Sequence, residues 1–97
     1  MMTITKTING NEAVLFFDGW LDTQAAPEMR AQIDALGEDI TSIVIDFEKL
    51  EYISSSGIRE VVAAYKKVDG RLKVLNASPG IMSIFKATGI DRKISFE

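Results

Sequence analysis

Three consecutive serines followed by a glycine are the residues of this chain best suited to chemistry. Ser54, Ser55, Ser56 and Gly57 come after a strand-like segment and directly before a helical pattern. Free backbone N–H groups and the helix dipole favour negative charge at a helix start, so a phosphate on one of these hydroxyls would be tolerated there. Serine is also a preferred N-cap residue. Capping and modification both stay open, because one cap leaves at least one hydroxyl unexplained.

A second candidate is the segment Asp18–Asp22, in which a strand ends in a carboxylate and a glycine before Trp20 and a second carboxylate. Two acids near a strand end could contribute to a metal site, but the sequence offers no evident third ligand. The favoured alternative makes Asp22 a helix cap and Trp20 a packing residue. We therefore expect no metal ion in this protein.

Asp46 is the third candidate, because it follows the apolar run 43–45 at the expected end of a central strand. Proteins of the α/β class commonly place functional groups at strand ends. A solvated carboxylate that merely ends the strand explains Asp46 equally well.

The residues that are missing exclude most catalytic classes. The chain has no cysteine and no histidine, so it has no thiolate nucleophile, no imidazole base and no zinc finger. Motifs for dinucleotides, for nucleotide phosphates and for serine hydrolases are also missing. Lys49, Lys66 and Lys67 lie in polar patterns, where a lysine is not desolvated enough to act as a base. The sequence predicts a protein that is not an enzyme and needs no cofactor.

Length and composition indicate one ordinary globular domain over residues 1–97. The chain is 46% hydrophobic and 26% charged, and its formal net charge is −3. This acidic balance argues against nucleic acid as a partner, which would require a clustered basic face. No signal-peptide pattern and no membrane-length apolar segment is present, so we expect a cytoplasmic protein without a membrane partner.

In the first half of the chain, the pattern predicts two strands, a helix and a third strand. Apolar residues alternate over Met2–Ile8, and Asn9-Gly10-Asn11 is a strong hairpin signal before the strand Glu12–Gly19. Asp22 or Thr23 is expected to cap a helix whose apolar stripe runs from Ala26 to Leu36 and which Gly37 ends. The strand Thr41–Phe47 lacks polar alternation, which predicts that both of its faces are covered.

In the second half, helices and strands continue to alternate. The expected elements are a helix over Ile58–Lys67, a strand over Arg71–Asn76, a helix that Ser78 and Pro79 start and Gly89 stops, and a short edge strand at Ile94–Phe96. The order is β-β-α-β-α-β-α-(β). Strands joined through helices run parallel, so the expected fold is α/β around a mixed sheet.

The motifs of the chain resemble those of the STAS domain, the sulphate transporter and anti-sigma factor antagonist family. The resemblance rests on Ser42–Phe47, on Leu50–Arg59 with its serine segment, and on Gly19–Asp22, which is similar to the Gly-x-Leu-Asp element of the family. Ala26–Arg30, Pro79-Gly80, Phe85 and Thr88–Ile90 also fit. The resemblance extends over almost the whole chain and implies the STAS-type fold.

The resemblance also implies a bacterial phospho-switch. The unphosphorylated antagonist would sequester an anti-sigma factor that is a serine kinase, and a PP2C-type phosphatase would reset the phosphorylated form. The family places the acceptor just before the glycine of the motif, at Ser56 here. Many members have Asp two residues before the acceptor, where this chain has Ser54, so Ser55 is a second candidate. The implied partner-binding residues are Asp22, Ser54, Ser55, Gly57, Ile58 and Arg59, although Ile58 is as well explained as a core residue.

Two other functions remain as alternatives. The first is a non-switching STAS scaffold, or a small partner subunit of a lipid-transport ATPase, in which the serines only cap the helix. The second is a small hydrolase that uses Ser56, which the missing base makes remote.

Overall fold

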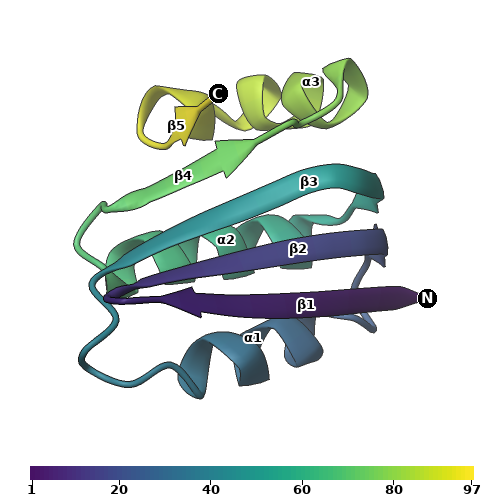
Figure 1. Cartoon of the computed structure of the whole chain (residues 1–97). Helices are drawn as coiled ribbons and strands as arrows, with labels where there is room; N and C mark the ends of the chain where they lie inside the picture. The colour runs from purple at the N-terminus through teal and green to yellow at the C-terminus, as the bar shows by residue number, and fades with distance from the viewer.

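The chain forms a five-stranded sheet with helices packed against it, and the computed structural model describes all of residues 1–97 (Figure 1). The elements are β1 (Met2–Asn9), β2 (Glu12–Leu21), α1 (Ala26–Asp34), β3 (Ser42–Ile53), α2 (Ser55–Lys67), β4 (Leu72–Leu75), α3 (Pro79–Thr88), the 3-10 helix η1 (Ile90–Arg92) and β5 (Ser95–Phe96). The strands lie in the order β1-β2-β3-β4-β5. β1 and β2 are antiparallel, and the other three pairs are parallel. The predicted α/β class, mixed sheet and order of elements are confirmed.

The core lies on one face of the sheet, between the strands and the helices. Alternate side chains of the central strands point into it, and Phe17 and Phe47 meet there edge to face with ring centroids 5.3 Å apart. α1 and α2 lie behind the sheet in Figure 1, and α3 adds Ile81 and Phe85 to the same buried cluster.

The apolar run 43–45 of the central strand is buried on both faces, as predicted, but helices cover only one of these faces. Val44 points away from the core cluster and is nevertheless buried, with only 5% of its surface exposed. Its neighbours in the register are Val14 on β2 and Lys73 on β4, whose side chains shield it from water. Burial by strand neighbours therefore produced the continuous apolar run that a second layer of helices would also produce.

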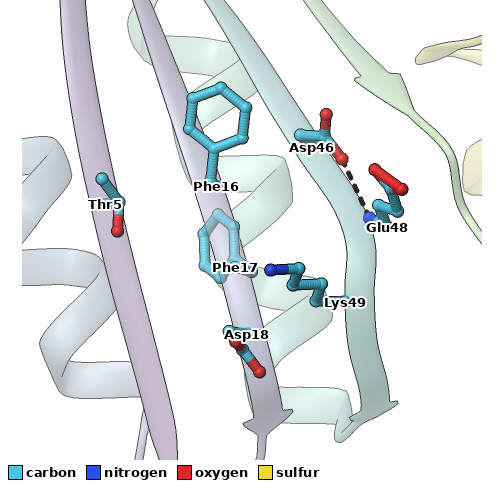
Figure 2. A pocket seen from close by; sticks show the side chains of 7 residues that line it. All are labelled: Thr5, Phe16, Phe17, Asp18, Asp46, Glu48 and Lys49. Atoms are coloured by element: carbon cyan, nitrogen blue, oxygen red, sulfur yellow. Dashed lines mark hydrogen bonds between the residues drawn. The ribbon is translucent and has the colours of Figure 1, made fainter.

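We call the other side of the sheet the open face and define it by its exposed aromatic residues Phe16, Trp20 and Tyr52. Their exposed fractions are 43%, 50% and 49%. Trp20 and Tyr52 are register partners on β2 and β3. Beside Phe16 this face carries a hollow of about 270 Å³, and Figure 2 shows that the lining side chains come from β1, β2 and β3.

β3 is longer than predicted because it contains two irregularities in its pairing with β2. The register shifts between Phe16 and Asp18 and again between Gly19 and Trp20, and each shift places an extra residue in β3. Such bulges break the alternation that identifies a strand, so the sequence pattern ended the strand at Phe47, whereas it runs to Ile53. Asp46 therefore lies within the strand, and its predicted position at the strand end is wrong.

Two helix boundaries also differ from the expectation. α1 ends at Asp34, with Ala35 as its C-cap in a right-handed conformation, so Gly37 does not end it. α2 begins at Ser55, ahead of the apolar pattern that starts at Ile58. The end of α3 is as predicted, because Gly89 adopts the left-handed conformation at φ 77° that favours glycine. None of the three helices has the length and apolar character needed to cross a bilayer.

Candidate functional site

Ser54 closes the N-terminus of α2. Its backbone is extended, with φ −92° and ψ 170°, and its hydroxyl accepts a hydrogen bond from the N–H of Gly57 at 3.1 Å. Its own N–H donates to the carbonyl of Leu21 at 2.9 Å, which joins the helix start to the end of β2. Ser54 is the single polar residue of the chain that is buried, at 9% exposure. The capping interpretation is thus confirmed for this one serine.

Ser55 and Ser56 occupy the first two positions of α2. Their N–H groups have no intrahelical acceptor, as at the start of every helix. The Ser55 side chain is exposed and that of Ser56 is half-buried. Since Ser54 supplies the cap, these two hydroxyls have no part in closing the helix.

Gly57 is present because the chain packs too closely for a side chain. A Cβ atom at this position would lie 2.8 Å from both Cγ and the carbonyl oxygen of Leu21 and 3.0 Å from Cγ1 of Ile53. Both approaching residues belong to this chain, Leu21 to β2 and Ile53 to β3. The requirement for glycine therefore lies in the packing of α2 on the sheet.

Ser56 borders a hollow of about 420 Å³ between the first turns of α1 and α2. From α2 the hollow is lined by Ser56, Arg59 and Glu60, which are neighbours on one helix face because residues three and four positions apart align. From the other side it is lined by Thr23, Ala26, Pro27 and Arg30. The half-buried Ser56 thus shares this hollow with charged residues from two helices.

An ion pair joins the two helices across this hollow. Nε of Arg30 donates to Oε1 of Glu60 at 2.6 Å, and Nη2 donates to Oε2 at 3.3 Å. This fork geometry is the one that arginine forms with carboxylates. The hydrogen bond and then the charge of Glu60 raise the pKa of Arg30, which stays cationic throughout the physiological range.

Ile58 and Arg59 differ in their surroundings. Ile58 belongs to the core cluster and is 6% exposed, so its core interpretation is confirmed and a partner could touch only its small exposed remainder. Arg59 is exposed and lines the Ser56 hollow as well as a second hollow beside Val62. Of these two, Arg59 is the group that is available to a partner.

The carboxylates of Asp18 and Asp22 have separate roles. The prediction that Asp22 or Thr23 caps α1 is wrong, because the N-cap is Ala25 and no side chain caps this helix. Asp22 instead accepts a hydrogen bond from the N–H of Ala25 at 2.9 Å and closes the turn before α1. Asp18 lies on the open face and lines the hollow of Figure 2. No group of three His, Cys, Asp or Glu side chains that could hold a metal ion forms in the structure.

The interpretation of Trp20 as a packing residue is wrong. Trp20 stands half-exposed on the open face, and its Nε1 donates to Oε2 of Glu51 at 3.0 Å. Its direction follows the unbroken alternation of β2, which buries Phe17 and Leu21 and turns the side chains at the even positions, Trp20 among them, away from the core.

Asp46 acts as a local bridge on the open face. Its Oδ1 accepts from the N–H of Glu48 at 2.9 Å and so supports the first irregularity of β3. The side-chain amide of Asn76, which follows β4, donates to both carboxylate oxygens at 3.3 Å. These contacts explain Asp46 as a structural residue at the edge of the hollow in Figure 2.

In a comparison with known protein families, the STAS domain matches residues 3–97. The chain belongs to the STAS family. This STAS domain is 28% identical over 85 residues to the anti-sigma-B factor antagonist of Bacillus subtilis strain 168, and the match covers 84% of the chain and 78% of the relative. The suspected family membership is therefore confirmed.

Solved structures give the same result for the fold. The STAS domain matches the Bacillus cell fate determinant SpoIIAA in its phosphorylated form with a TM-score of 0.77 and 25% identity, over 98% of this chain and 91% of that one. It also matches an anti-sigma factor antagonist from Mycobacterium paratuberculosis with a TM-score of 0.87 and 23% identity, over 99% and 85% of the two chains, which shows the fold alone. The Bacillus subtilis relative and the mycobacterial protein are both named as anti-sigma factor antagonists.

Sequence reasoning missed Arg30 and Glu60 as parts of this site. Glu60 lies four residues after Ser56 on the same helix, so its position beside the serine could have been found from the spacing. Arg30 had no such signal. Its place depends on how α1 packs against α2, and 30 residues separate it from its partner in the chain.

Proposed function

We propose that this STAS domain is an anti-sigma factor antagonist controlled by phosphorylation. Its unphosphorylated form binds an anti-sigma factor with serine kinase activity and thereby releases a sigma factor. Phosphorylation of Ser56 breaks that complex, and a PP2C-type phosphatase restores the binding form. In this role residues 1–97 act as one cytoplasmic binding domain without catalytic activity of their own.

The observation that carries the proposal is that only one of the three serines caps the helix. The Ser54 hydroxyl is used by the cap, at 3.1 Å from the N–H of Gly57. Ser55 and Ser56 keep their hydroxyls for other chemistry and lie at a helix start, where a phosphate is stabilised by free N–H groups. Ser56 is favoured as the acceptor because it immediately precedes Gly57, and Ser55 remains the second candidate.

A phosphate at this position would act on the interface rather than on the fold. Phosphoserine adds about −1.5 to −2 charge and three acceptor oxygens. At the N-terminus of α2 these are favourable for the free protein, whereas in a docked complex their bulk and the loss of their hydration oppose contact. Arg59, Asp22 and the exposed edge of Ile58 are the neighbouring groups that we expect to touch the anti-sigma factor.

The decisive experiment is phosphorylation by the cognate anti-sigma factor with ATP, followed by mass spectrometry of the modified peptide. We expect one phosphate on Ser56, none on a Ser56→Ala variant, and unchanged modification of a Ser55→Ala variant. Ser56→Ala should remain folded and bind the anti-sigma factor constitutively, because the cap depends on Ser54. Full modification of Ser56→Ala would move the acceptor to Ser55.

A complete lack of phosphate on either serine would favour the alternative, a non-switching STAS scaffold or a small partner subunit of a lipid-transport ATPase. The relatives named as antagonists make this the less favoured function. Binding of a partner protein without phosphorylation of either serine would indicate this alternative function.

A further inference from the structure

The ion pair between α1 and α2 occupies the same hollow that the Ser56 phosphate would enter. Glu60 is four residues from Ser56 on one helix face, and Arg30 reaches Glu60 from the other helix with a shortest contact of 2.6 Å. The Glu60 side chain is 15% exposed, whereas that of Arg30 is 51% exposed. The carboxylate is therefore held in place, and the guanidinium has room to move.

The side chains that line this hollow carry a net positive charge before modification. Two guanidinium groups, Arg30 and Arg59, face the single carboxylate of Glu60. A phosphate of about −1.5 to −2 charge would reverse the sign of the hollow. It would also repel Glu60, because like charges four residues apart on a helix destabilise each other.

Arg30 is the group that can relieve this repulsion. Arginine binds phosphate with the same fork of N–H donors that it uses for carboxylate, and a dianionic phosphate attracts it more strongly than a carboxylate does. Its partner Glu60 lies one helical turn from Ser56, so a guanidinium beside Glu60 is already close to where the phosphate would stand.

We propose that the guanidinium of Arg30 binds the phosphate on Ser56. Phosphorylation then replaces the Arg30–Glu60 ion pair with an Arg30–phosphate ion pair between the same two helices. This inference rests on the proposed phosphorylation of Ser56. It adds a positioning residue on α1, which the serine motif on α2 does not contain. The exchange also leaves Glu60 without its partner next to the modified serine.

The test measures the pKa of the phosphate by ³¹P NMR in full-length protein into which phosphoserine is incorporated at position 56 during synthesis. An adjacent guanidinium favours the dianion and lowers this pKa. Arg30→Gln should raise the phosphate pKa by about 0.5 or more, less than the 1–3 seen for fully paired groups, because the hollow is open to water. Arg30→Lys should restore part of the difference, and Glu60→Gln should lower the pKa.

Arg92→Gln is the control, since Arg92 lies in η1 and does not line this hollow. An Arg30→Gln effect no larger than that of Arg92→Gln would overturn the inference. A larger change of the phosphate pKa in Arg59→Gln than in Arg30→Gln would also overturn the inference, because it would show that Arg59 binds the phosphate. A merely structural role of Arg30 would change stability and leave the phosphate pKa unmoved.

Because the phosphate is installed without a kinase, this experiment is independent of the proposed function. If the anti-sigma factor fails to phosphorylate Ser56, the proposed function falls while the ion-pair exchange can still be observed. If the anti-sigma factor phosphorylates Ser56 but the phosphate pKa does not depend on Arg30, the proposed function stands and only the ion-pair exchange is refuted.

Discussion

The start of α2 and the open face differ in how closely they are packed. At the start of α2, small polar side chains lie against the backbone at the ends of β2 and β3. On the open face, large aromatic side chains project from the side of the sheet that the helices do not cover. Gly57 has no room even for a methyl group. Phe16, Trp20 and Tyr52 are about half-exposed. We therefore expect substitutions on the open face to have smaller effects than substitutions at the start of α2, although the open face exposes more apolar surface. A small chemical change has its greatest effect where nothing nearby can move aside.

Gly57 gives the largest expected effect and the sharpest test of this contrast. Gly57→Ala should destabilise the protein relative to Gly80→Ala by about 1–3 kcal/mol, because its new Cβ collides with Leu21. Gly80 is the matched control, since a Cβ there meets only Oγ of Ser78 at 4.0 Å. Both changes gain helix propensity, so that contribution cancels.

Urea denaturation of the two variants measures the difference. The atoms that a Cβ at Gly57 would meet belong to Leu21 and Ile53 of the same chain, so the change acts on the fold itself. Stability should fall at least as much as binding. Equal stability of the two alanine variants would show that α2 can shift away from β2 without cost.

A negative charge should act differently in the two regions. Ser56→Asp should weaken binding to the anti-sigma factor at least tenfold, about 1.4 kcal/mol, and genuine phosphoserine should weaken it more, because aspartate carries a single charge. Thr5→Asp adds the same charge beside the open-face hollow and should change affinity less than twofold.

Titration calorimetry of both variants against the anti-sigma factor checks this, with melting temperatures as the control for folding. A similar loss of affinity in Thr5→Asp would mean that the partner responds to net charge alone or docks on the open face. In either case the contrast between the two regions would fail.

The smallest expected effect concerns the aromatic pair Trp20 and Tyr52 on the open face. These residues are register partners, and such cross-strand pairs contribute about 0.2–1 kcal/mol. A double-mutant cycle with Trp20→Ala and Tyr52→Ala should give a coupling free energy of unfolding in that range, and affinity for the anti-sigma factor should not change. A loss of affinity in these variants would assign the open face to the partner.

The order of elements could be predicted because each core face carries its own period of apolar residues. The strand β3 was cut short because its two register shifts place Lys49 and Glu51 where alternation from Phe47 requires an inward side chain. Trp20 was expected to pack because large aromatic residues are highly buried on average, although the alternation of β2 directs it away from the side that Phe17 and Leu21 share. The first error arises from irregular strand pairing, which sequence periodicity does not report, and the second from giving residue type more weight than the alternation of the strand.

The candidate site was predictable as far as it is local. The serine segment and its cap lie within four consecutive residues, so spacing was sufficient to find them. The partition of roles among the serines and the contribution of Arg30 depend on the docking of α1 and β2 against α2. Those contacts join residues about a third of the chain apart, and no local pattern encodes them.

The hydrogen bond from the N–H of Ser54 to the carbonyl of Leu21 has a consequence for recognition by enzymes. It fixes the serine segment to the sheet, and the Ser54 cap holds the next turn in a helix. The segment cannot be drawn into an extended active-site groove without breaking both contacts and separating Gly57 from Leu21. A kinase or phosphatase that acts on Ser56 must therefore recognise a folded surface, and an isolated peptide of the same sequence would lack the shape that it reads.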